Sequence, residues 1–131
     1  MQVNGRFLLD TNIIIALFAG DHAIHIRILK ADEVFVPSIA LGELYFGASK
    51  SHRIQENIML IDRFAKDSAI LACDAETARR YGEIKGHLKE KGRLIPENDI
   101  WIAAIAQQND LVLVTRDTHF ISVTHIKKET W

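Results

Sequence analysis

Two short stretches decide the fold, FLLDTN at residues 7–12 and LVLVTRD at residues 111–117. Each begins as a run of large apolar residues and then turns polar, with Asp10 and Asp117 in the polar part. A short apolar run with polar boundaries predicts a strand that is buried on both faces. Both carboxylates are therefore expected just beyond the carboxyl ends of buried strands.

Working outward from these stretches, apolar runs alternate with segments of helical periodicity. Further strands are predicted at residues 34–36 and 69–72, with a weaker one near 123–126. Helices are predicted over residues 12–18, 21–30, 39–49 (capped by Ser38), 54–64, 75–91 (capped by Asp74) and 97–108. Helices between buried strands are typical of a mostly parallel sheet, so we expect a three-layer α/β/α domain. Such sheets bind ligands beyond the carboxyl ends of their strands.

Length and composition indicate one folded domain over residues 1–131. The chain is 48% hydrophobic and has few Pro and Gly residues, which excludes disordered and low-complexity classes. Its single cysteine, Cys73, excludes an internal disulfide framework and a cysteine-based zinc site. The most apolar stretch, residues 7–19, contains Asp10 and is shorter than the ~20 residues of a membrane-spanning helix. We therefore expect a cytoplasmic protein with no membrane partner.

Two further carboxylates stand in apolar surroundings. Glu43 is the only charged residue between positions 33 and 50, so no basic side chain on its own helix can reach it. Asp99 is followed at helical spacing by apolar residues, and its neighbour Asn98 is the more obvious helix cap. For each acid taken alone, a cap, a turn or a distant ion pair remains an open alternative.

Together, Asp10, Glu43, Asp99 and Asp117 are expected to converge at one end of the sheet. Like charges this close cannot all stay ionised unaided. Oxygen ligands with no Cys and no required His favour Mg²⁺ or Mn²⁺ over zinc. Such an ion keeps coordination positions open for a phosphate, which suits hydrolysis of a phosphodiester.

Four motifs follow one another along nearly the whole chain. They are Leu9-Asp10-Thr11-Asn12, Pro37-Ser38 leading to Glu43-Leu44, Asn98-Asp99 followed by Ile102-Ala103-Ala104, and Val114-Thr115-Arg116-Asp117 with Phe120. In this order and at these separations they resemble the PIN-domain nucleases, and most closely the VapC-type toxins of prokaryotic toxin–antitoxin pairs.

The resemblance implies an endoribonuclease that uses one or two Mg²⁺ or Mn²⁺ ions and leaves 5′-phosphate and 3′-hydroxyl ends. It makes Asp10, Glu43, Asp99 and Asp117 the catalytic and metal-binding acids, with Glu43 either a ligand or a residue that orients the attacking water. Thr11, Asn12 and Thr115 would support these acids, and Arg116 is a candidate phosphate contact. The resemblance also implies a homodimer and a small antitoxin whose tail enters the active-site groove.

Other functions remain open at this stage. A PIN domain that works in RNA processing, or a non-catalytic module that binds RNA or protein, has much the same sequence. A phosphoryl-transfer domain with Asp10 as nucleophile is disfavoured because Asn12 stands where a second acid is needed. Residues 75–93 carry six Lys or Arg against three Glu, which suits either an RNA backbone or a solvated helix face. His22 and His25 are interpreted as solvated residues.

The charge balance at first argues against nucleic acid, because 16 Lys and Arg face 17 Asp and Glu, a formal charge of -1. Without the four predicted site acids, the same 16 basic residues face 13 acidic ones, a formal charge of +3. The near-neutral total therefore combines a basic remainder with an acidic pocket, and it does not exclude an RNA substrate.

Overall fold

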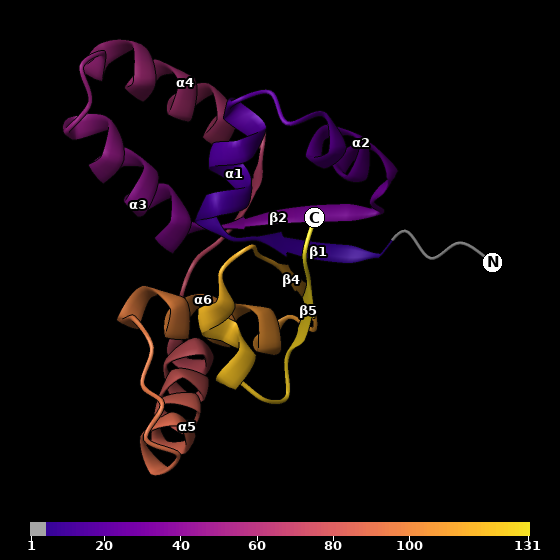
Figure 1. The fold of residues 1–131 in the computed structure, drawn as a ribbon, viewed down its shortest axis with the longest axis vertical. Helices are drawn as coiled ribbons and strands as arrows, with labels where there is room; N and C mark the ends of the chain where they lie inside the picture. The colour runs from indigo at the N-terminus through magenta and orange to yellow at the C-terminus, as the bar shows by residue number, and fades with distance from the viewer. Residues whose placement is uncertain (1–4) are drawn as a thin grey trace.

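The computed structural model describes residues 5–131, in which strands and helices alternate (Figure 1). The first half contains β1 (Arg6–Leu9), α1 (Thr11–Phe18), α2 (His22–Lys30), β2 (Glu33–Pro37), α3 (Ser38–Ser49) and α4 (Ile54–Lys66). The second half contains β3 (Ala69–Leu71), α5 (Ala75–Glu90), α6 (Glu97–Gln108), β4 (Val112–Val114), the 3₁₀ helix η1 (Thr118–Ser122) and β5 (Lys127–Glu129). Nearly all of these elements were predicted, within a few residues at each end.

Within the described residues, five strands form one sheet in the order β3-β2-β1-β4-β5, and every neighbouring pair is parallel. Strands β2 and β3 follow one another on one side of β1, and β4 and β5 follow one another on the other side. The strand order therefore reverses between β1 and β4, where a crevice at the carboxyl ends is expected. The Asp10 amide donates to the Val114 carbonyl at 3.0 Å, which joins the two strand ends.

Helices cover both faces of the sheet, which confirms the three-layer α/β/α prediction (Figure 1). On one face Leu8 and Leu113 pack with buried residues of α5, α6 and η1. On the other face Leu9 and Val114 pack with buried residues of α1 to α4. Because both β1 and β4 are buried on both sides, the carboxyl ends of these strands are held rigidly.

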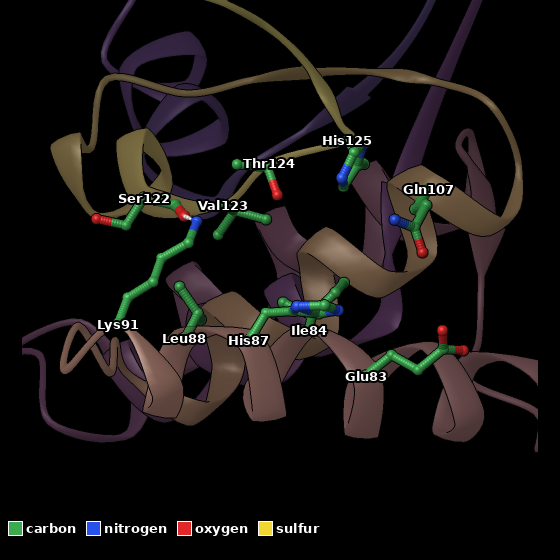
Figure 2. Close-up of a pocket in the computed structure, with 10 residues that line it drawn as sticks. All are labelled: Glu83, Ile84, His87, Leu88, Lys91, Gln107, Ser122, Val123, Thr124 and His125. Atoms are coloured by element: carbon green, nitrogen blue, oxygen red, sulfur yellow. Dashed lines mark hydrogen bonds between the residues drawn. The ribbon is translucent and has the colours of Figure 1, made fainter.

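The predicted strand at residues 123–126 is wrong, because the last strand is Lys127–Glu129 at the edge of the sheet. An exposed edge strand carries charged residues and gives no apolar run to detect. Residues 123–125 instead line a cavity of about 90 Å³ against α5, where His125 and His87 stand at the wall (Figure 2).

Two predicted helix caps are also wrong. Helix α6 begins at Glu97 with Pro96 as its N-cap residue, and α3 begins at Ser38 with Pro37 in the same place. The backbone of each proline is extended in ψ, and the Pro96 carbonyl accepts from the amides of Asp99 and Ile100. Asn98 therefore lies inside the first turn of α6, next to Asp99, and does not cap the helix.

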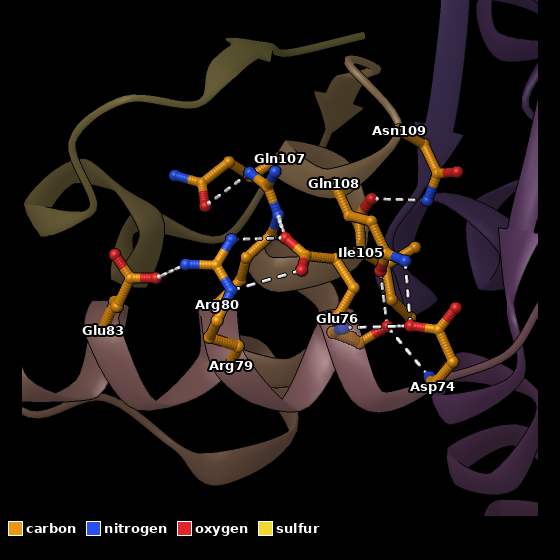
Figure 3. Close-up of polar contacts among 10 residues, drawn as sticks. Asp74, Glu76, Arg79, Arg80, Glu83, Ile105, Gln107, Gln108 and Asn109 are labelled. Carbon is orange, nitrogen blue, oxygen red and sulfur yellow. Dashed lines mark hydrogen bonds and ion pairs between the residues drawn. The ribbon is translucent and has the colours of Figure 1, made fainter.

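Helices α5 and α6 are joined by buried and exposed polar contacts (Figure 3). Thr77 is completely buried, and its hydroxyl contacts both the Asp74 carboxylate and the Gln108 side chain, whose amide donates to Asp74 at 2.9 Å. On the surface, Glu76 pairs with Arg79 and with Arg80, each at 2.7 Å. These surface pairs support the interpretation of residues 76–80 as a solvated helix face. The contacts between α5 and α6 also hold α6, the helix that carries Asp99, in place.

The lengths and hydropathies of the helices show whether any of them could span a membrane. Among helices in residues 5–131, none alone has the length and hydropathy to cross a bilayer. Helices α1 and α2 reach that threshold only when taken together, and they are bent by 113° at the break between them.

We predict that the buried contact of Thr77 stabilises the fold far more than the neighbouring surface pairs. Thr77→Val removes the hydroxyl and leaves the Asp74 and Gln108 side chains without it, so the free energy of unfolding should fall by roughly 1–3 kcal/mol. Arg79→Ala should change it by less than about 0.5 kcal/mol because its pairs are exposed. Urea unfolding followed by circular dichroism measures both, and equal losses would contradict the prediction.

Candidate active site

Asp10 follows β1 and caps α1, which confirms the cap interpretation, and its site role stays a prediction. Its carboxylate accepts from the Thr11 amide at 2.8 Å and from the Thr115 hydroxyl at 2.7 Å. The Asn12 amide nitrogen lies 3.3 Å from the same group. The predicted supporting residues thus surround Asp10, which is only 3% exposed.

Thr115 links the end of β4 to the end of β1. Its hydroxyl donates to Asp10 and accepts from the Asp117 amide at 2.9 Å. Asn12 completes the link, because its side-chain oxygen accepts from the Arg116 amide at 3.1 Å. Asp117 in turn caps η1 by accepting from the His119 amide at 2.9 Å. The two stretches that decide the fold therefore also position two of the predicted acids.

Glu43 reaches the site from α3, the helix that follows β2. The Thr11 hydroxyl donates to its carboxylate at 2.9 Å. This neutral donor takes the place of the distant Arg or Lys that was the alternative explanation for Glu43.

Asp99 enters from the first turn of α6, where it is 8% exposed. A residue that the sequence did not single out meets it there. The Nδ1 atom of His119 lies 2.8 Å from a carboxylate oxygen of Asp99 and 3.0 Å from one of Asp117. These three residues and Glu43 share one cleft, which is lined by Glu43, Pro96, Glu97, Asn98, Asp99, Asp117 and His119.

Burial and mutual repulsion raise the pKa of three of these acids. Burial is the main cause for Asp10, whose pKa rises to about 6, with further increases from Asp99 and Glu43 and opposing hydrogen bonds from Thr115 and Thr11. Burial also raises the pKa of Glu43 and of Asp99, and Asp117 adds repulsion to both. The hydrogen bond to Asp99 raises the pKa of His119. The four acids therefore interact electrostatically as one group.

The donor set fits a hard divalent cation. Among the described residues that line the cleft, none has a Lys or Arg side chain that would neutralise the acids. Arg116 is directed elsewhere, because its guanidinium donates to Asp21 at 2.8 Å and to the Trp131 carbonyl at 2.9 Å. A phosphate contact by Arg116 requires these bonds to break and stays a prediction. Carboxylates that no Lys or Arg side chain neutralises are typical ligands of Mg²⁺ or Mn²⁺.

Comparison with known proteins then decides the family. The PIN domain family model matches residues 7–126, and Ribonuclease VapC2 of Haemophilus influenzae is 36% identical over 132 aligned residues, covering 96% of this chain and 98% of the relative. The chain belongs to the PIN-domain family. A further relative of this PIN domain is the tRNA(fMet)-specific endonuclease VapC of Shigella flexneri, at 33% identity over 96% of this chain and 98% of the relative.

Solved structures agree with this assignment. The PIN domain superposes with a TM-score of 0.89 and 31% identity on a chain of DNA-bound VapBC from Salmonella typhimurium, covering 96% of this chain and 98% of that chain. VapBC2 from Rickettsia felis, bound to a DNA fragment from its promoter, gives a TM-score of 0.87 at 29% identity, covering 95% and 98%.

We predict that Asp10→Asn stabilises the metal-free protein. Because the native pKa of about 6 lies above the ordinary value of 3.8, the native state holds this proton more tightly than the unfolded chain. Stability linked to Asp10 is therefore present at low pH and is lost as the pH rises through about 6, by roughly 2 kcal/mol between pH 4 and pH 7. Asn removes the charge and keeps the shape.

Urea unfolding with a chelator present measures the effect. Asp10→Asn should raise the free energy of unfolding by roughly 2–3 kcal/mol at pH 7 and by less than about 1 kcal/mol at pH 4. The same substitution at the exposed Asp67 is the matched control, with an expected change below about 0.5 kcal/mol at either pH. A destabilised Asp10→Asn protein at pH 7 would show that repulsion at this site is not the dominant effect.

Proposed function

We propose that this protein is a divalent-metal-dependent endoribonuclease and the toxin of a VapBC-type toxin–antitoxin pair. One observation supports this most strongly: Glu43, Asp99 and Asp117 line one cleft and interact electrostatically with one another or with Asp10, while no described residue lining that cleft is a Lys or Arg. The names of its relatives supply the substrate class, since they are ribonucleases and a tRNA(fMet)-specific endonuclease. The substrate proposed here is accordingly RNA.

Each of the four acids has a proposed role that follows from its position. Asp10 and Asp99 hold one or two Mg²⁺ or Mn²⁺ ions, with Asp117 completing the ligand set. When bound, the cation polarises the scissile phosphate and lowers the pKa of water. Thr115 and Thr11 fix the orientation of Asp10, and Thr11 also binds one oxygen of Glu43. Glu43 is thereby placed to ligate the cation or to orient the attacking water.

The reaction is hydrolysis of one phosphodiester bond. A water oxygen bonds to phosphorus and the bond to the 3′ oxygen breaks, so that the products carry a 5′-phosphate and a 3′-hydroxyl. The alternative in which Asp10 is the nucleophile is disfavoured, because Asn12 stands where such a mechanism needs a second acid.

A small antitoxin is the proposed partner. The structural relatives are VapBC complexes. In this chain an apolar groove opens beside Glu43 between α1, α3 and α4, lined among others by Phe18, Leu44 and Leu60. Ile15 is 54% exposed and Leu60 is 40% exposed, so the groove presents neighbouring apolar side chains to solvent, as a protein-binding groove does. We further propose that residues 1–131 act as one PIN domain, as a homodimer, in the cytoplasm.

We predict that RNA cleavage depends on both a divalent ion and the acids. The wild-type protein should cleave RNA with Mg²⁺ or Mn²⁺ and not with a chelator, and Asp99→Asn should lower the rate at least about 100-fold. Either ion should raise the melting temperature of the wild type and not that of Asp99→Asn. Asp67→Asn is the control that should retain both properties. Equal cleavage by wild type and Asp99→Asn would sink the proposal.

Growth tests separate a toxin from an RNA-processing enzyme. Expression of the wild-type chain alone should arrest growth, and expression of Asp10→Ala should not. Co-expression of a short reading frame adjacent to this gene should restore growth. It should fail to do so for Leu60→Asp, a change in the groove that leaves the acids in place. Normal growth with active wild-type enzyme would favour the RNA-processing role.

A further inference from the structure

Among the described residues that line the cleft, His119 is the one imidazole. It stands in η1, two residues after Asp117, and its side chain turns back so that Nδ1 faces Asp99 and Asp117. Across residues 5–131, Asp99, Asp117 and His119 are the one group of three Asp, Glu, His or Cys residues whose ligand atoms all lie within 4.8 Å of one another. The best-formed set of ligand atoms in the described structure therefore includes an imidazole.

The spacing of these atoms matches the edges of a coordination octahedron. Ligands about 2.1 Å from an ion and at right angles to each other are about 3.0 Å apart. The Nδ1 atom of His119 lies 2.8 Å from the Asp99 oxygen and 3.0 Å from the Asp117 oxygen. Two of the three separations thus equal those of neighbouring ligands on one ion, and all three residues offer ligand atoms within 4.8 Å of one another.

We propose that His119 is a metal ligand through Nδ1, and that this nitrogen makes the site select Mn²⁺ over Mg²⁺. The inference rests on the proposed function, since it concerns the ion of the same site. It changes the ligand set from all oxygen to oxygen and nitrogen.

The chemical reason lies in the preference of each ion. Mg²⁺ is hard, binds carboxylate and water oxygens, and gains little from an imidazole. Mn²⁺ accepts oxygen ligands in the same octahedral geometry. Unlike Mg²⁺, it is a first-row transition metal ion and belongs to the Irving–Williams series of ions that bind nitrogen as well as oxygen ligands. An imidazole among carboxylates therefore retains Mn²⁺ binding while it reduces the relative affinity for Mg²⁺.

The contacts of His119 and Asp99 hold both side chains in place at the cleft. The carboxylate of Asp117 caps η1 by binding the His119 amide, so backbone and side chain of His119 both contact Asp117. Asp99 is anchored by α6, and α6 by its contacts with α5. The His119 side chain is 46% exposed, which leaves the site open to solvent ions.

His87 supplies a matched control. It lies on α5 at the wall of the separate cavity formed with residues 122–125, near His125 (Figure 2). It is exposed like His119, and it is absent from the cleft that contains the acids. Replacing His87 by Asn therefore makes the same chemical change away from the site.

The test compares Mn²⁺ and Mg²⁺ binding by isothermal titration to the wild type, His119→Asn and His87→Asn. Asn keeps a polar side chain and replaces the nitrogen donor with an oxygen. His119→Asn should lower Mn²⁺ affinity at least about tenfold and Mg²⁺ affinity by less than about threefold. His87→Asn should change neither. Circular dichroism melts of the metal-free proteins verify that all three fold.

A spectroscopic measurement decides between a ligand and an ion-pair partner. Electron spin echo modulation of the Mn²⁺-loaded wild type should show coupling to an imidazole ¹⁴N nucleus, and His119→Asn should lose it. Absence of ¹⁴N coupling in the wild type, or equal losses of Mn²⁺ and Mg²⁺ affinity in His119→Asn, would overturn the inference. Either result can occur while RNA is still cleaved, so failure here is distinct from failure of the proposed nuclease function.

Discussion

Repulsion between buried carboxylates is the constraint on which this structure depends. Asp10 is nearly inaccessible, yet Asp99 and Glu43 are close enough to raise its pKa further above the value set by burial. The hydrogen-bond donors around Asp10 and Glu43 are neutral groups of Thr11, Asn12 and Thr115, which orient these two carboxylates without neutralising them. A charge left uncompensated in this way costs stability in the metal-free state and creates affinity for a cation. The same arrangement thus links folding to the proposed chemistry.

The sheet topology explains why the acids meet. Asp10 and Asp117 follow the two strands between which the strand order reverses, and Glu43 and Asp99 come from helices packed against opposite faces of the sheet. Each acid is attached to a different rigid element, so the cleft is assembled only when all layers are in place. The charge balance fits this picture. Glu43, Asp99 and Asp117 line the cleft, and Asp10 is buried and interacts with Asp99 and Glu43. Part of the basic excess elsewhere is held in pairs such as Arg80 with Glu76.

Much of this was predictable from local patterns. The apolar runs ending in Asp10 and Asp117 predicted both the buried strands and the shared edge, and the absence of a basic neighbour near Glu43 predicted a partner from elsewhere. Local patterns fail where the deciding contact is distant in sequence. His119 meets Asp99 from 20 residues away. Its place two residues after Asp117 is the one local signal that separates it from His22 and His25, which are exposed on α2. The edge strand at Lys127–Glu129 was missed because charged edge residues carry no burial signal.

If a divalent cation relieves the repulsion around Asp10, binding of Mn²⁺ must release protons, and the number released can be measured. Calorimetric titrations in two buffers of different ionisation enthalpy give this number. With a pKa of about 6, Asp10 alone should release about half a proton at pH 6 and almost none at pH 8. The wild type should release more protons at pH 6 than at pH 8, and this difference should be smaller in Asp10→Asn. Tight Mn²⁺ binding with the same proton release at both pH values would contradict this prediction.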